Sequence, residues 1–201
     1  MTLSIRASTQ DERRELYREF KPRFDEYLSY LTEWNRALNL YSRGGEVDPL
    51  NDLLLPSLAC ADSDMIQNAG QGIDLGSGGG FPGLVLAIAR PDLTIRLTER
   101  IRKKTSFLRF VIQKLQLSNV SVFFGDVALI SDNIKYNFMS ARLFSSIGNI
   151  TGYAQPLLAE NGVLLVFKPD SEMEDFKQLG WRIRKRLEVG VQRSLFLLEQ
   201  G

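Results

Sequence analysis

A glycine-rich loop between an apolar run and a helix constrains this chain more than any other feature. The segment from Ile73 to Leu75 reads as the end of a buried strand, four glycines follow between positions 76 and 80, and a helix is expected from about Pro82. Glycine permits positive φ and close backbone approach, and a helix N-terminus offers unpaired amides. The loop is therefore typical of a cradle for a nucleotide-like ligand, with a ligand-free tight turn as the alternative.

The identity of that ligand depends on the flanking residues. Residues 78–83 satisfy the Gly-x-Gly-x-x-Gly pattern of dinucleotide enzymes, and Glu99 follows at the distance where such enzymes carry a ribose-binding acid. Glu99 would accept hydrogen bonds from ribose hydroxyls in either ligand. Asp74 just before the first glycine, and a strand hairpin at the end of the chain, favour S-adenosylmethionine. A nicotinamide-dependent oxidoreductase stays open at this point.

From residue 71 onward, short apolar runs alternate with helical patterns, which predicts a parallel sheet covered by helices. The last two strands have no helix between them, so residues 189–192 are expected to form a hairpin. The predicted fold class is α/β and Rossmann-like, with a seven-stranded, mostly parallel sheet and an antiparallel C-terminal hairpin. Strands are expected at 71–75, 93–98, 120–124, 135–141, 162–168, 180–188 and 193–199, and helices at 82–90, 101–116, 145–159 and 171–178, with a short turn after Asp126.

The residues before the sheet have a helical pattern. Thr9 and Glu12 have the spacing of a capping box, and apolar residues recur at helical intervals up to Leu38, with Pro22 marking the start of a second helix. A third helix is expected from about residue 49 to residue 60. We expect a single domain over residues 1–201, with residues 1–62 forming a helical extension packed on it.

Composition excludes several kinds of chemistry. The chain has no histidine and a single cysteine, Cys60, which excludes Ser-His-Asp triads, Cys-His pairs and histidine-based zinc sites. We expect no metal, and we expect Cys60 to be a small buried apolar residue. No apolar stretch approaches the roughly 18 residues of a membrane helix, and no signal sequence is evident. The prediction is a cytoplasmic protein without membrane contact.

Four segments carry a resemblance to a known family: residues 34–40, 73–83, 103–109 and 141–144. Residues 34–40 read Trp-Asn-x-x-x-Asn-Leu and residues 76–83 read Gly-x-Gly-x-Gly-x-Pro-Gly, a combination much rarer than either motif alone. The likeness runs from about residue 30 to the C-terminus. The chain resembles the bacterial 16S ribosomal RNA guanine-N7 methyltransferases, also called glucose-inhibited division protein B.

The resemblance implies a class I S-adenosylmethionine-dependent methyltransferase fold, S-adenosylmethionine as the methyl donor and a guanine of small-subunit rRNA as the acceptor. Arg142 matches an arginine that the family uses at the donor site, and it is the candidate catalytic residue. Asp126 would accept from the exocyclic amine of adenine, or hold a turn. The expected donor site comprises Asp74, Gly76, Gly78 and Phe81, Glu99 at the ribose, Asp126, Val127 and Ala128 at the adenine, and Arg142.

Two segments depart from the family pattern. Where the family reads His-Ile-x-Asp-Ser-Leu, residues 53–58 read Leu-Leu-Leu-Pro-Ser-Leu, and where it reads Ser-Arg-Ala-Phe, residues 141–144 read Ala-Arg-Leu-Phe. Methylation of guanine N7 removes no proton, so it needs positioning more than a general base. A methyltransferase with another acceptor, or a non-catalytic RNA-binding or ribosome-assembly factor, is the alternative.

The net charge is only +1, so contact with RNA must come from a local basic surface. Eight basic residues and two acidic ones lie between Arg90 and Lys114. The residues expected to contact RNA are Arg102, Lys103, Lys104, Arg109 and Lys168, the last with a solvent-exposed lysine as the alternative. Alternation along a strand predicts a second cluster, with Arg182, Arg184 and Arg186 on one face. The expected partner is 16S rRNA or the 30S subunit, with the protein acting as a monomer.

Aromatic residues divide into two groups. Phe81 and Phe144 are candidates for stacking on a splayed base. The aromatic residues expected in the core are Trp34, Phe107, Phe110 and Trp181.

Overall fold

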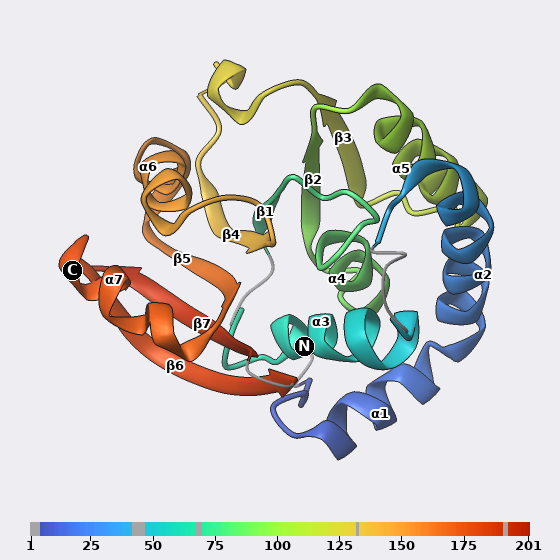
Figure 1. The fold of residues 1–201 in the computed structure, drawn as a ribbon, viewed down its shortest axis with the longest axis horizontal. Coiled ribbons are helices and arrows are strands. Elements are labelled where there is room, and N and C mark those ends of the chain that lie inside the picture. The colour runs from blue at the N-terminus through green and yellow to red at the C-terminus, as the bar shows by residue number, and fades with distance from the viewer. Residues whose placement is uncertain (1–4, 42–46, 67–69, 132, 191–192) are drawn as a thin grey trace.

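The computed structural model describes the chain except residues 1–4, 42–46, 67–69, 132 and 191–192. Its centre is a seven-stranded sheet in the order β3-β2-β1-β4-β5-β7-β6 (Figure 1). The strands are β1 (Gln71–Leu75), β2 (Thr94–Glu99), β3 (Val120–Phe124), β4 (Tyr136–Arg142), β5 (Leu158–Lys168), β6 (Trp181–Gly190) and β7 (Arg193–Gln200). Strands β1 to β5 are parallel to one another, whereas β7 is antiparallel to both β5 and β6. The predicted fold class is confirmed.

The central strands are apolar on both faces because helices cover both sides of the sheet. In β1 every residue after Gln71 is buried, and in β4 every residue except Asn137 is buried. The predicted strand positions are confirmed with small shifts. The largest is in β5, which begins at Leu158 because that residue pairs with Tyr136 across an irregularity in the register.

The helices are α1 (Gln10–Glu19), α2 (Lys21–Leu38), η1 (Pro49–Leu54), α3 (Leu55–Leu58), η2 (Ala59–Ala61), α4 (Gly83–Ala89), α5 (Arg102–Lys114), η3 (Val127–Leu129), α6 (Ile147–Leu157), η4 (Asp170–Glu172) and α7 (Met173–Gln178). Both bonds of the predicted capping box join Thr9 and Glu12. Residues 49–61 form one helical stretch, as expected, but its first part, η1, is a wider π-helical turn.

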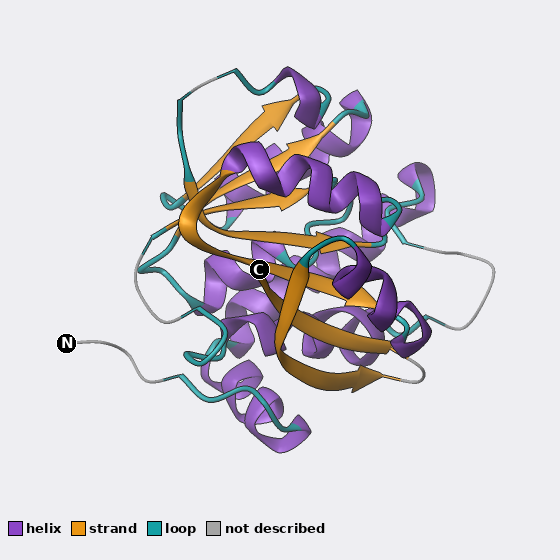
Figure 2. Cartoon of the chain, turned by 90° about the vertical axis from the view of Figure 1, so that its left-hand side faces the viewer, coloured by secondary structure: helices purple, strands orange, loops and turns teal. Residues whose placement is uncertain are grey.

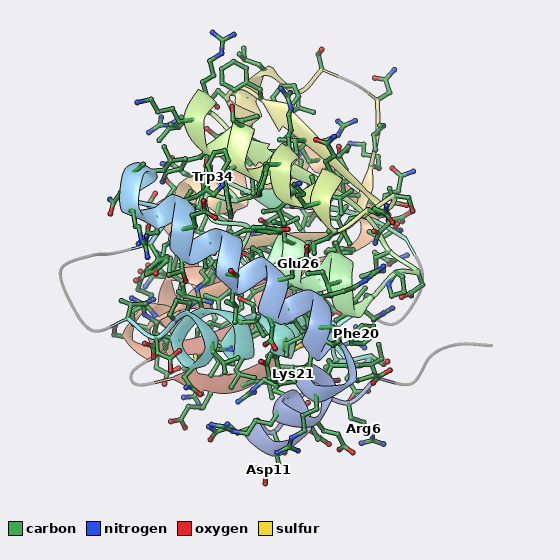
Figure 3. The ribbon with its side chains drawn as sticks, turned by 90° about the vertical axis from the view of Figure 1, so that its right-hand side faces the viewer. Arg6, Asp11, Phe20, Lys21, Glu26 and Trp34 are labelled. Atoms are coloured by element: carbon green, nitrogen blue, oxygen red, sulfur yellow. The ribbon has the colours of Figure 1, made fainter. Side chains whose placement is uncertain are left out.

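Helices cover both faces of the sheet (Figure 2), and a hydrophobic core lies on each face. The N-terminal helices pack with α4 and α5 in one core, and α6 and α7 cover the other (Figure 1). On α2, Trp34 contacts the rings of Phe107 and Phe110 on α5, with centroids 5.6 and 5.1 Å away (Figure 3). Trp181 and Cys60 are buried, as expected. No helix in the described part of the chain has the length and apolar character needed to cross a bilayer.

Candidate functional site

The glycine loop leaves the carboxyl end of β1, at the place where the strand order reverses direction. Strand β1 lies between β2 and β4, so chain connections run to opposite sides of this point, which is where open α/β sheets bind ligands. Gly78 has a φ of +54°, a conformation that glycine adopts without strain. At Gly83, an added Cβ would lie 2.3 Å from the side chain of Leu97, so glycine is required for α4 to pack this close to the sheet.

Asp74 lies beneath this loop, fully buried, and its Oδ1 accepts a hydrogen bond of 2.7 Å from the Ser140 hydroxyl. Burial raises the pKa of its carboxyl to about 6 and outweighs the hydrogen bonds that the carboxylate receives. Asp74 lines neither of the cavities beside the loop. The structure therefore places it as a support for the loop and not as a wall of the ligand space.

The raised pKa of Asp74 has a consequence for stability. An acid whose pKa is higher in the folded state stabilises the fold below its ordinary pKa of 3.8, and this contribution is lost as pH rises through 6. Because the amide stays neutral, we expect the stability of Asp74→Asn relative to the wild type to rise by about 2–3 kcal/mol between pH 4 and pH 8. Urea unfolding of both proteins from pH 4 to pH 8 measures this difference. Parallel pH profiles for the two proteins would contradict the prediction.

Two cavities adjoin the loop. The first, which we call the Glu99 cavity, has a volume of about 310 Å³. The second, the Arg142 cavity, has a volume of about 450 Å³ and extends to the β6–β7 hairpin. Both are lined by Gly76, Gly78, Lys104 and Leu143. A ligand that passes over the glycine loop can therefore occupy both cavities.

Glu99 ends β2 at the wall of the first cavity. Its Oε2 accepts a hydrogen bond of 3.0 Å from the Gly78 amide, and its Oε1 accepts one of 2.8 Å from the Ile101 amide. Each carboxylate oxygen can accept more than one hydrogen bond, so both keep acceptor capacity for a ligand. The two amides fix the carboxylate at the junction of β2 and the loop.

The predicted adenine-binding residues follow β3. Asp126 and Val127 line the Glu99 cavity, whereas Ala128 does not. Asp126 Oδ1 accepts a hydrogen bond of 2.9 Å from the Ala128 amide, which caps η3. The structure thus shows the turn-holding role that the sequence offered as an alternative, and Asp126 also faces the cavity.

Arg142 ends β4 and is only 8% exposed. Its guanidinium donates to the Leu53 carbonyl at 2.8 Å, to the Ser57 hydroxyl at 3.0 Å and to the Asp52 carbonyl. Burial, together with the charge of Arg193, lowers its pKa to about 10, so it remains a cation at neutral pH. Arg142 therefore fastens η1 to the end of β4 while lining the cavity with Phe81.

Comparison with known proteins identifies the family. Residues 21–192 match the family described as GidB, rRNA small subunit methyltransferase G. The chain belongs to this family. A methyltransferase G of Janthinobacterium sp. (strain Marseille) is 34% identical, over 80% of this chain and 74% of the relative. One from Thermobifida fusca (strain YX) is 34% identical, over 82% and 70%. The resemblance inferred from the motifs is confirmed.

Solved structures that resemble this methyltransferase G chain share its fold at low sequence identity. The PH0226 protein of Pyrococcus horikoshii gives a TM-score of 0.62 at 13% identity, covering 84% of this chain and 99% of that one. A SAM dependent methyltransferase from Aquifex aeolicus gives 0.59 at 15%, covering 76% and 98%. The fold is that of the class I methyltransferases.

Several residues that line the two cavities were not expected from the sequence. Leu143 has a φ of +53°, is 71% exposed and lines both cavities. A leucine rarely adopts this conformation, and such strain gathers at functional sites. Asp52 and Arg193 line the Arg142 cavity from η1 and from the hairpin. The only sequence signal was at Leu143, which stands where the family pattern has alanine.

The basic residues predicted to contact RNA fall into two groups. Arg102, Lys103 and Arg109 are exposed on α5, and no ion pair holds any of them within the described part of the chain. Lys104, on the same helix, is half-buried and lines both cavities. Lys168 lines neither cavity, and its ammonium lies 2.8 Å from Glu172. Four of the five residues therefore belong to one helix that starts at the site.

The second basic cluster is not a single face, which corrects the sequence prediction. A register shift between Ile183 and Lys185 interrupts the alternation in β6. As a result Ile183 packs on one core and Leu187 on the other, which puts Arg182 and Arg186 on opposite faces. Arg182 and Arg184 pair with Glu199, and Arg186 pairs with Asp170. Arg90, the first of the basic residues counted between positions 90 and 114, is buried and pairs with Asp92.

Proposed function

We propose that this protein transfers a methyl group from S-adenosylmethionine to N7 of a guanine in 16S rRNA. The observation that carries the proposal is the meeting of two cavities at the glycine loop. The Glu99 cavity has the fixed Glu99 carboxylate at its wall, and the Arg142 cavity is lined by cations. A donor that lies in the first cavity and extends over Gly78 would meet an acceptor in the second.

The residues present fit S-adenosylmethionine. Glu99 keeps acceptor capacity for two ribose hydroxyls, and Asp126 and Val127 offer an acceptor and an apolar surface for adenine. Gly78 has no side chain to fill the space between the cavities. Arg142 and Lys104 would balance the negative charge of the carboxylate in the methionine part of S-adenosylmethionine. When bound, the donor supplies an electrophilic methyl group on a sulfonium.

The chain's own residues contribute binding and orientation. Guanine N7 carries a free lone pair, so no group has to remove a proton and the absence of histidine is no obstacle. Arg142 stays protonated and holds the wall of the cavity. The protein's task is to hold the two reactants in line and exclude water, which is catalysis by positioning.

The exposed cations of α5 support RNA as the partner. Arg102, Lys103 and Arg109 extend from the site along one helix, and phosphate contacts of this kind make affinity fall steeply with salt. We propose that the protein acts as a cytoplasmic monomer on the 30S subunit or its rRNA. Residues 1–62 would then be a helical extension of a single catalytic domain.

Methyl transfer to small subunits tests the proposal. Small subunits that lack the modification are incubated with the protein and methyl-labelled S-adenosylmethionine, and the RNA is digested and analysed for N7-methylguanine. We expect label in that nucleoside alone. RNA binding without transfer would instead support a ribosome-assembly factor, an alternative favoured by the apolar Leu53 and Pro56 in the Arg142 cavity. Binding of a nicotinamide dinucleotide in place of S-adenosylhomocysteine would support an oxidoreductase.

A further inference from the structure

The Arg142 cavity contains a carboxylate that forms no ion pair with the described residues. Three cations line this cavity, Lys104, Arg142 and Arg193, and Asp52 is the acid among its described lining residues. The Asp52 side chain is exposed, and none of the ion pairs in the described part of the chain includes it. A carboxylate left unpaired beside cations retains acceptor capacity for a ligand that brings hydrogen-bond donors.

The position of Asp52 is fixed by its backbone and by its side chain. Its carbonyl accepts a hydrogen bond from Arg142, which ties it to the end of β4. Its Oδ2 accepts one of 2.8 Å from the Asp48 amide, at the start of η1. Asp52 is therefore held before any ligand arrives, which lowers the entropic cost of recognition.

We propose that Asp52 selects guanine in the Arg142 cavity, by accepting hydrogen bonds from N1–H and from the 2-amino group. This inference rests on the proposed function. The Watson–Crick edge of guanine presents these two donors side by side, and enzymes that act on an extruded base read that edge. Adenine presents an acceptor at N1 and has no 2-amino group, so the carboxylate disfavours it.

The same contact would orient the reacting atom. Guanine N7 lies on the opposite edge of the base from N1 and the 2-amino group. A guanine held by Asp52 therefore turns N7 away from η1, toward the other walls of the cavity, which include Gly76 to Gly79 of the glycine loop. Recognition and positioning are thus achieved by one carboxylate.

One departure from the family pattern, at Pro56, lies close to Asp52. That pattern has an acid at the position of Pro56, and Pro56 lines the same cavity. Residues 52 and 56 are about one turn apart along the helical stretch that begins with η1. In this chain the carboxylate that lines the Arg142 cavity is therefore that of Asp52, about one turn before Pro56.

Asp52→Asn tests the inference, because the amide retains the shape of the side chain and an acceptor for the Asp48 amide. We expect kcat/KM for methyl transfer to RNA to fall about 100-fold. The reason is that the side-chain amide places its NH2 group, a donor, against one of the two N–H donors of guanine. The affinity for S-adenosylhomocysteine, measured by calorimetry, should change less than threefold. The matched control is Asp48→Asn, an acid-to-amide change in the same segment that lies outside the cavity lining, and it should retain transfer.

A substrate change probes the same contact from the other side. Inosine lacks the 2-amino group, so an RNA with inosine at the acceptor position should react about tenfold more slowly than the guanosine RNA with the wild type. The Asp52→Asn protein should methylate the inosine RNA and the guanosine RNA at similar rates. The inference is overturned if Asp52→Asn transfers methyl groups within threefold of the wild type, or if both proteins discriminate against inosine equally. If the wild type methylates no small-subunit RNA, the proposed function fails and the inference falls with it.

Discussion

Gly78→Val is expected to abolish binding of S-adenosylhomocysteine while the protein stays folded. A Cβ at position 78 would have the Gly76 carbonyl, at 3.7 Å, as its nearest described neighbour, so the protein has room for a side chain there. That room is the junction of the Glu99 and Arg142 cavities, where the donor must pass. Calorimetric titration should show at least a 100-fold loss of affinity, and thermal unfolding should remain cooperative.

Gly180→Val provides a matched control for this experiment. Gly180 has a φ of +79°, lies between α7 and β6 and has nothing within 4 Å of an added Cβ. The Gly180→Val substitution therefore causes the same type of backbone strain as Gly78→Val, about 1–2 kcal/mol, at a position away from both cavities. We expect this variant to bind S-adenosylhomocysteine like the wild type. Equal affinity in the Gly78→Val protein would show that the loop does not cradle the donor.

Arg142→Met is expected to lower the free energy of unfolding by about 3 kcal/mol and to eliminate methyl transfer. The substitution removes the guanidinium donor from the Asp52 carbonyl and the Ser57 hydroxyl, and it leaves the Leu53 carbonyl with the Ser57 hydroxyl as its donor. Each buried group left unsatisfied costs about 1–3 kcal/mol, and removal of a buried cation offsets part of that cost. Urea unfolding and the labelled-methyl assay measure the two effects.

Two further variants separate charge from geometry at this position. Arg142→Lys keeps the cation, but a single ammonium cannot reach all three acceptors, so its stability should fall between those of Arg142→Met and the wild type. Arg109→Met removes an exposed arginine from α5 and should change stability by less than about 0.5 kcal/mol. A fully stable Arg142→Met protein would mean that η1 is held in place by other contacts.

The sequence predicted most of the fold because local and tertiary preferences agree there. The capping box at Thr9, the glycine loop and the apolar runs of the central strands each specify one local structure, and all of them form where expected. The π-helical geometry of η1 could not be predicted in this way. Its Leu53 carbonyl accepts a hydrogen bond from Arg142, which lies 89 residues away in the chain, and no local pattern indicates such a contact.

The site was predicted less completely than the fold. Gly76, Gly78 and Glu99 line the cavities beside the loop, as the motif and its sequence neighbours indicated. Lys168 was expected near the acceptor, but its ion pair with Glu172 depends on how the chain turns after β5. The register shift in β6, which separates Arg182 from Arg186, left no mark in the alternation of residue types.

The position of β7 between β5 and β6 has a consequence for the order of folding. Strand β7 is hydrogen-bonded to both β5 and β6, so β6 cannot join the sheet before β7 is in place. Arg193, the first residue of β7, lines the Arg142 cavity. The wall of that cavity is therefore completed only when β7 inserts, a step that the glycine loop after β1 does not require.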